Sequence, residues 1–293
     1  MIVRKEHRVL VQGITGKQGT FWTQAMQDYG TTVVAGVNPS KAGTTHLEVP
    51  VYACAVDAAR DIGIDVSVMF IPPMAARAAA IDACEAGVKM IVCLTEHIPA
   101  HDVMEMHAAA AANGVRIVGP NTAGLVTPGE CFVGIMPAFN AKVFKPGDIG
   151  VISRSGSLGT LVSLNLTQSG FGQSAFYGVG GDPMIGTTSR DALEILDADD
   201  RTKAIVLCGE IGGSAEENAA EYAATMSKPV VAFIAGKASP PGKKMGHAGA
   251  IVSGSSGAYG SKRAALEAAG VAVADVPSQI PVLLKEGLDR KAA

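Results

Sequence analysis

A histidine in a loop of small residues is the first candidate for chemistry in this sequence. His247 lies between Gly246 and Ala248, which neither shield the imidazole nor stiffen the chain around it. Earlier, Glu210 follows the apolar run 204–207 in a glycine-rich turn. Imidazole is a competent nucleophile near neutral pH, and a carboxylate on one ring nitrogen fixes the tautomer, so that the other nitrogen can attack phosphorus. A histidine in such a loop is often incidental, however, and the spacing leaves open whether Glu210 reaches it.

Glycines recur every third residue where the first predicted strand gives way to a helix. Gly13, Gly16 and Gly19 form the series G-x-x-G-x-x-G. Glycine permits tight turns, and free N–H groups at a helix start attract anions, so the loop suits a phosphorylated ligand. The spacing is not G-x-G-x-x-G, and Asn38 rather than an acidic residue ends the next strand, which disfavours NAD. An ordinary strand-to-helix turn would use the same glycines, and Lys41 is either a phosphate contact or a solvated charge.

A second anion site is predicted in the other half of the chain. The apolar run 149–152 leads into Ser-Arg-Ser-Gly-Ser at residues 153–157, and the following segment has helix-forming composition. Hydroxyls and free amides at a helix start can hold a phosphoryl group. Serine is also a common helix N-cap, so this motif alone leaves both interpretations open.

Short β-branched runs alternate with alanine-rich segments along both halves of the chain. The runs are typical of buried strands. Stretches of helix-forming composition at residues 19–29, 74–86 and 100–113 suit crossovers between parallel strands. The pattern therefore predicts a doubly wound α/β fold. The predicted strands are residues 8–12, 32–37, 66–71, 89–94 and 115–118, then 149–152, 173–177, 204–207, 230–234 and 271–274.

A lapse in this alternation marks the predicted domain boundary. Proline and glycine recur through residues 119–147, as in a connector that can hold a hairpin. We predict a Rossmann-like domain at residues 1–125, a connector at 126–147 and a flavodoxin-like, doubly wound parallel-sheet domain at 148–293. Ligand sites on such sheets gather at the carboxyl ends of the strands, where all the motifs above are expected.

Composition excludes several classes of protein. The 293 residues are 48% hydrophobic and 17% charged, which predicts extensive burial in about two domains. A net charge of −3 without a basic run disfavours nucleic acid, and no apolar run is long enough to cross a membrane. The five cysteines lack the spacing of a metal site or a disulfide framework. With no signal or transit peptide visible, we expect a soluble cytoplasmic protein, in the bacterial cytosol or, in a eukaryote, the mitochondrial matrix.

The order of the motifs resembles that of succinyl-CoA synthetase (succinate–CoA ligase) alpha subunits, a family that includes malate–CoA ligase small subunits. The resemblance covers nearly the whole chain, and GEIGG followed by MGHAGA is its most specific part. The motifs are GITGKQGT, NPSKAGTTH, LTEHIP, GPNTAG, SRSGSLG, GVGGDP, GEIGGSAEE and GKKMGHAGA.

This resemblance implies a role for each candidate residue. His247 is expected to be phosphorylated transiently, Glu210 to steady it, and the helix start at residues 153–157 to receive the phosphoryl group. The implied phosphate-binding residues are Ser153, Arg154, Ser155, Gly156 and Ser157, and those implied to contact CoA are Thr15, Gly16, Lys17, Gln18, Lys41, Leu94, Thr95 and Glu96.

The resemblance also implies a reaction and a partner. A nucleoside triphosphate loads the histidine, an acyl phosphate then activates a carboxylic acid, and the CoA thiol displaces phosphate to give a thioester. ATP or GTP, with Mg²⁺, is implied to bind a separate beta subunit of the ATP-grasp type, in a heterodimer or a dimer of heterodimers, and no metal site is expected in this chain.

Departures from the family pattern bear on the acid substrate. Succinate enzymes usually carry a Tyr where this chain has Thr160, so Thr160 is a candidate contact for the acid. Succinate is the default prediction for the acid substrate. The sequence Gly-Ile-Met-Pro at residues 134–137 equally resembles malate–CoA ligases, and citrate or another acid is a further alternative. The rival interpretations are a CoA-binding module without turnover, which retention of His247 and Glu210 opposes, and an NAD-dependent oxidoreductase, which Asn38 and Lys41 oppose.

Overall fold

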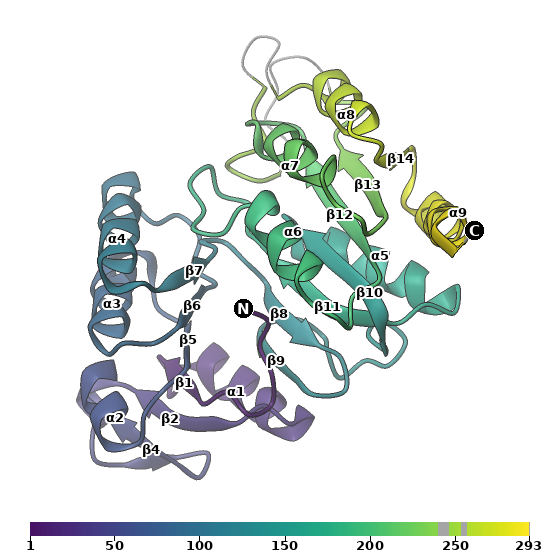
Figure 1. Ribbon diagram of the computed structural model, residues 1–293. Coiled ribbons are helices and arrows are strands. Elements are labelled where there is room, and N and C mark those ends of the chain that lie inside the picture. Colours follow the sequence, from purple (N-terminus) through teal and green to yellow (C-terminus); the bar gives the residue numbers. More distant parts are fainter. Residues whose placement is uncertain (240–245, 253–256, 293) are drawn as a thin grey trace.

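The computed structural model describes residues 1–239, 246–252 and 257–292. Of the predicted histidine loop, Lys244 and Met245 lie outside these ranges. The described residues form two α/β units side by side, each built on one sheet (Figure 1). The predicted α/β class, with a Rossmann-like unit followed by a flavodoxin-like unit, is confirmed.

The first sheet is parallel apart from a short strand at its edge. Its central strands, such as Val-Leu-Val-Gln and Met-Ile-Val-Cys, are buried at every position, as expected for strands covered on both faces. The order across the sheet is β3 (Thr45–His46), β4 (Val49–Tyr52), β2 (Val33–Val37), β1 (Val9–Gln12), β5 (Val66–Met69), β6 (Met90–Cys93) and β7 (Arg116–Val118).

Helices cover both faces of this sheet. Three pack together on one face, and α1 lies on the other, against the second unit (Figure 1). The short strands β3 and β4 and the helix α2 were not predicted, since their sequences are brief and carry no sustained periodicity. The elements are α1 (Lys17–Tyr29), η1 (Pro39–Lys41), α2 (Ala55–Asp61), α3 (Pro73–Glu85) and α4 (Ala100–Asn113).

The second sheet is parallel apart from a hairpin at one edge. The hairpin, at residues 124–134, begins just before the stretch predicted as a connector at residues 126–147 and continues into it, so that part of the stretch belongs to the sheet of the second unit. The order is β14 (Ala272–Ala274), β13 (Val230–Ala235), β12 (Ala204–Glu210), β10 (Pro146–Ser153), β11 (Gln173–Gly178), β8 (Gly124–Thr127) and β9 (Cys131–Gly134).

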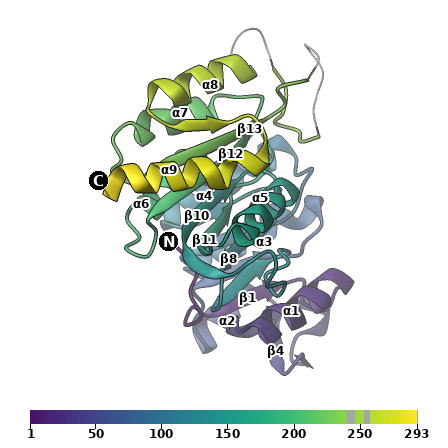
Figure 2. The same ribbon diagram turned by 90° about the vertical axis from the view of Figure 1, so that its right-hand side faces the viewer.

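The helices of the second unit divide between the two faces of its sheet. In the turned view, α5 and α9 lie together in front of the sheet, and α6, α7 and α8 lie behind it (Figure 2). The elements are α5 (Gly156–Gln168), α6 (Ser189–Asp197), α7 (Ala215–Ala223), α8 (Tyr259–Ala268), η2 (Pro277–Gln279) and α9 (Ile280–Ala292).

The hairpin joins the two units through a shared core. Phe132 of β9 is fully buried and meets Trp22 and Tyr29 of α1 edge-on, with ring centroids 6.4 and 5.6 Å apart. The Thr31 hydroxyl donates to the carbonyl oxygen of Phe132 at 2.7 Å. Because one apolar cluster runs from β1 through this hairpin to β12, the two units are packed against each other.

Candidate active site

The carboxylate of Glu210 and the ring of His247 are in contact, although the two residues are 37 positions apart in the chain. Nδ1 of the imidazole lies 2.8 Å from Oε2 of Glu210 and 3.0 Å from Oε1. An ionised carboxylate only accepts hydrogen bonds, so Nδ1 carries the proton. In the neutral ring, Nε2 is then left with its lone pair, the arrangement a nitrogen nucleophile needs.

Two backbone features place the imidazole at this point. Strand β12 ends at Glu210, and the loop after β11 brings Gly181 beneath the histidine loop. The N–H of Gly249 donates to the carbonyl of Gly181 at 3.1 Å, and that of Ala250 donates to the carbonyl of His247 at 3.1 Å. A Cβ at residue 181 would lie 2.6 Å from Cγ of His247, so only glycine leaves room for the ring.

Charge around the ring favours its protonated form. The hydrogen bond that the imidazole donates to Glu210 raises the pKa of His247 above its ordinary value of 6.5, with partial burial of the ring acting in the opposite direction. Coulombic attraction to Glu210 and Asp182 raises this pKa further, while the positive charge of Arg154 lowers it. The carboxylate therefore both orients the imidazole and stabilises positive charge on it.

The histidine faces a cavity of about 290 Å³ next to the start of α5. Ser155 and Ser157 line the cavity together with Glu210 and Gly246. Ser155 caps α5, its side chain accepting the N–H of Leu158 at 3.3 Å, and the two serine hydroxyls lie 3.2 Å apart. A helix start with free amides attracts anions, so a phosphoryl group on the imidazole would have donors on the facing wall.

Other residues of the predicted phosphate loop point elsewhere. Ser153 is fully buried, and its hydroxyl donates to the carbonyl of Ser155 at 2.7 Å. The Arg154 side chain turns inward, with Nη2 lying 3.3 Å from Oε1 of Glu210. The hydroxyl of Thr160, the candidate contact for the acid, donates to the carbonyl of Gly156 at 2.8 Å, so its proton is already engaged within α5.

A groove crosses the carboxyl edge of the first sheet, where the predicted CoA contacts lie. Two cavities, of about 550 and 500 Å³, share Phe70, Ile71 and Pro72 in their walls. Gly16 and Asn38 line the first. The second is lined by the predicted residues Gln18, Leu94, Thr95 and Glu96.

The remaining predicted CoA contacts lie outside the walls of these cavities. Lys17 and Lys41 are exposed, at the start of α1 and in η1. The Thr15 hydroxyl accepts a hydrogen bond from Nδ2 of Asn38, whose Oδ1 also caps η1 through the N–H of Ser40. Asn38 thus ties the glycine loop to the end of β2, a role that the sequence analysis missed because it weighed Asn38 only as evidence against NAD.

Asn121 connects the groove to the histidine loop. Its N–H donates to the carbonyl of Thr95 at 2.9 Å, and its own carbonyl accepts the N–H of Gly181 at 3.1 Å. Its side-chain amide donates to Oδ1 of Asp182 at 3.0 Å. The motif Gly-Pro-Asn therefore fixes the edge of the groove relative to the loop after β11, whose Gly181 in turn contacts the histidine loop, a function its sequence gave no signal of.

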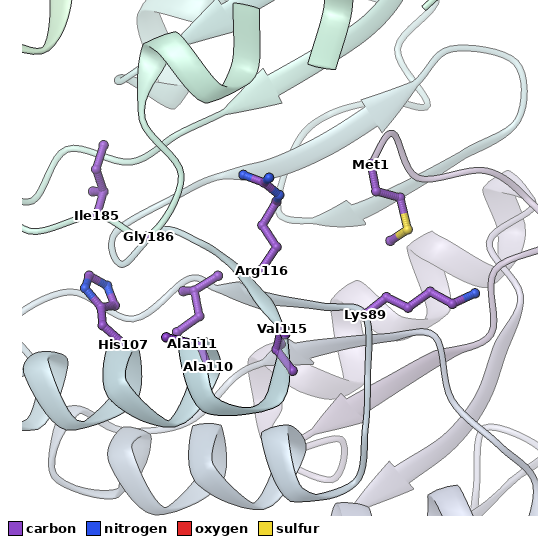
Figure 3. Close-up of a pocket in the computed structure, with 11 residues that line it drawn as sticks. Met1, Lys89, His107, Ala110, Ala111, Val115, Arg116, Ile185 and Gly186 are labelled. Carbon is purple, nitrogen blue, oxygen red and sulfur yellow. The ribbon is translucent and has the colours of Figure 1, made fainter. Parts of the chain in front are cut away.

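A further cavity of about 470 Å³ lies at the opposite edge of the first sheet, between α4, β7 and the loop at Ile185 (Figure 3). Its cations have partners, since Lys89 pairs with Asp65 at 2.9 Å and Arg116 lies 4.0 Å from Asp191. None of the residues that line this cavity lines the cavity at His247 or the groove on the first sheet. Among the described residues, no group of histidine, cysteine and carboxylate side chains could hold a metal ion, and no helix is long and apolar enough to span a membrane.

Comparison with known proteins supplies the family. Residues 4–97 match the model of a CoA binding domain, and residues 152–272 match that of a CoA-ligase. The chain is 48% identical over 286 residues to an ADP-forming succinate–CoA ligase subunit alpha 2 of Archaeoglobus fulgidus, covering 98% of this chain and 99% of the relative. The chain belongs to the succinate–CoA ligase alpha subunit family. The expected family is thereby confirmed, and a second member, from Methanothermobacter thermautotrophicus, is 48% identical over 96% of this chain and 94% of its own.

The fold of this family recurs in a larger enzyme. The structure of Methanosaeta concilii ATP citrate lyase in complex with (3S)-citryl-CoA superposes with a TM-score of 0.90 at 23% identity, over 99% of this chain. The chain spans about half of that protein, 51% of its length. At this level of identity the likeness extends to the fold alone, and it covers both α/β units.

Proposed function

We propose that this chain is the alpha subunit of an ADP-forming succinate–CoA ligase that works through a phosphohistidine at His247. The contact between the Glu210 carboxylate and Nδ1 of the imidazole carries the proposal, because it holds the ring in the tautomer that leaves Nε2 to attack phosphorus. The names of the relatives supply the class of reaction, and the groove on the first sheet supplies a place for CoA.

The first step transfers a phosphoryl group to the ring. Nε2 forms a bond to the γ-phosphorus of ATP, the bond from that phosphorus to the bridging oxygen breaks, and ADP leaves. Nδ1 keeps its proton and its hydrogen bond to Glu210, which offsets the positive charge that develops on the ring. The serine hydroxyls and amides at the start of α5 would stabilise the transferred oxygens.

Two further transfers complete the reaction. A carboxylate oxygen of the acid attacks the phosphorus, the nitrogen–phosphorus bond breaks, and an acyl phosphate forms while the ring returns to neutral. The CoA thiolate then attacks the acyl carbon and phosphate leaves, giving the thioester. Splitting one condensation into these steps is ordinary covalent catalysis, and each step is reversible.

The nucleotide and Mg²⁺ are assigned to a partner. Within the ranges that the structure describes there is no metal-binding cluster, and the cavity at His247, of about 290 Å³, is at the lower limit for a ligand pocket. We assign nucleotide and metal to a beta subunit of the ATP-grasp type, in a heterodimer or a dimer of heterodimers. Succinate is the proposed acid, and malate and citrate are the alternatives to test.

The test is a phosphorylation assay on the assembled protein. The chain is co-expressed with its candidate beta subunit and incubated with γ-labelled ATP and Mg²⁺. We expect acid-labile, base-stable label on the wild type and on His101→Ala, a control at an exposed histidine of α4, and no label on His247→Ala. Discharge of the label is then followed with succinate, malate and citrate, each with CoA.

The outcomes separate the alternatives. Discharge by one acid identifies the substrate. An intact complex whose wild type takes no label would contradict the ligase mechanism and favour a CoA-binding module without turnover.

A further inference from the structure

Behind Glu210 lies a row of buried side chains with alternating charge. Arg154, only 6% exposed, places Nη2 3.3 Å from Oε1 of Glu210 and Nη1 3.6 Å from Oε1 of Glu216. Glu216 and Lys262 are both fully buried and are paired through Oε2 and Nζ. From the imidazole inward, the order is His247, Glu210, Arg154, Glu216 and Lys262.

Glu216 binds this row to the backbone as well. Its Oε1 accepts the N–H of Glu210 at 3.2 Å, at the last residue of β12. Nη1 of Arg154 donates to the carbonyl of Gly212 at 3.2 Å, in the turn that follows. The Glu216 carboxylate, at the start of α7, therefore contacts both the end of the strand that carries Glu210 and the guanidinium of Arg154, which also lies beside Glu210.

The glycines around the row leave space for it. A Cβ at residue 209 would lie 2.5 Å from Cγ and 2.6 Å from Oε1 of Glu216. A Cβ at residue 249 would lie 2.7 Å from Nη2 of Arg154. A Cβ atom essentially never approaches another heavy atom this closely, so the glycines of two separate motifs, GEIGG and GHAGA, accommodate the charged row and not only the imidazole.

Burying such a row is costly, because each ion loses its hydration and is repaid only by well-placed partners. A buried ion pair is often replaceable by apolar residues without loss of stability, so stability is a weak reason to retain one. The row here ends on the candidate nucleophile. This points to a function in positioning Glu210 and not merely in holding α7 against α8.

We infer that Glu216 is a positioning residue of the histidine site, holding Arg154 and the end of β12 so that Glu210 engages the imidazole, with Lys262 as its counter-charge. With Glu216 neutral, Arg154 draws the Glu210 carboxylate toward itself and away from Nδ1. The kinetic part of this inference rests on the proposed function of His247, whereas the effect on the imidazole does not.

Titration of His247 tests the positioning directly. Full-length protein labelled with ¹⁵N-histidine is titrated by NMR, with the signal assigned by its absence in His247→Ala. In Glu216→Gln we expect the pKa of His247 to fall by roughly 0.5–1 unit, because Arg154, once it has lost Glu216, competes with the imidazole for Glu210. Among the described residues, the charged groups that act on this ring are Glu210, Arg154 and Asp182, all unchanged by the substitution.

Glu217→Gln is the matched control. Glu217 lies on the same helix and contacts the same Lys262, at 3.1 Å, but no hydrogen bond or ion pair links it to Arg154 or Glu210 among the described residues. It removes the same charge from the same helix and should leave the titration of His247 unchanged. In Glu216→Gln, Glu217 still partners Lys262, which favours a folded variant.

Kinetics on the assembled ligase supply the second readout. In Glu216→Gln we expect the rate of phosphorylation of His247 to fall roughly tenfold, in the range of coupling within one ion-pair network, with an unchanged KM for CoA. If the single variant does not fold, the double variant Glu216→Gln with Lys262→Met removes both buried charges. The NMR titration of His247 in that protein should show the same fall in pKa, because Glu216 no longer holds Arg154 away from Glu210.

The results separate this inference from the proposed function. An unchanged His247 titration in folded Glu216→Gln, or an equal shift in Glu217→Gln, would overturn the positioning role. A shifted titration in a protein that is never phosphorylated would retain the positioning role and reject the ligase mechanism.

Discussion

Gly181→Ala should slow the phosphorylation of His247 by displacing its ring, although the substitution leaves His247 and Glu210 themselves unchanged. The new methyl carbon would lie 2.6 Å from Cγ, 2.7 Å from Nδ1 and 2.8 Å from Cδ2 of His247. Moving the ring to an ordinary contact of 3.4 Å requires a displacement of about 0.8 Å. Because Nδ1 lies only 2.8 Å from Oε2 of Glu210, a shift of that size stretches the hydrogen bond beyond its useful range.

The cost can be estimated from that hydrogen bond. A bond to a charged group contributes about 1.5–3 kcal/mol, and each 1.36 kcal/mol is a factor of ten in rate. We therefore expect phosphorylation of the histidine to slow by roughly 10- to 100-fold. Single-turnover labelling of the assembled protein with γ-labelled ATP measures this rate.

Gly260→Ala is the control for this prediction. Residue 260 lies in α8, where an added Cβ has no neighbour within 4 Å. Both variants should fold, as checked by circular dichroism and thermal melting. Labelling of folded Gly181→Ala at the wild-type rate would refute the reasoning, because it would show that the position of the ring does not limit the transfer.

Three further predictions concern pH, CoA and packing. Only the neutral ring attacks, so the raised pKa of His247 predicts that the phosphorylation rate rises with pH at a midpoint above 6.5. Glu210→Gln should move that midpoint to lower pH. A midpoint that stays in place would contradict Glu210 as the group that raises this pKa. The ion pair between protonated His247 and Glu210 stabilises the folded protein below pH 6.5, and this contribution is lost as the pH rises through the raised pKa of His247. Asn38→Ala removes the hydrogen bond to the Thr15 hydroxyl and the cap of η1. In steady-state assays, KM for CoA should therefore rise while the rate of histidine phosphorylation is unchanged. A changed phosphorylation rate with constant KM would contradict a role of Asn38 in the CoA groove. Gly36→Ala would bring a Cβ to 2.3 Å from Cγ2 of Ile14 and should cost about 1–3 kcal/mol of unfolding free energy in urea titrations, whereas an unchanged midpoint would show that Ile14 repacks freely.

Much of the fold could be predicted from local patterns in the sequence. Strands such as Val-Leu-Val-Gln are apolar throughout because both faces of a parallel sheet are covered, and that signal is visible in four residues. The glycine series after β1 marked a strand-to-helix turn at the right point. By contrast, the sequence indicated only that a hairpin could lie in the predicted connector. It did not reveal that this hairpin joins the second sheet, because that depends on pairing with β11, which is distant in sequence.

The chemistry of the candidate site was only half determined by the sequence. Residue types made His247 a candidate nucleophile and Glu210 a candidate partner, since a small-residue loop and a carboxylate at a strand end are local features, and the family resemblance implied their roles. Their contact at 2.8 Å joins two loops, and only the tertiary structure could decide it. The same holds for Arg154, which the motif assigned to phosphate and the fold turns toward Glu210, and for Glu216, whose role arises from burial beneath β12 and from no local pattern.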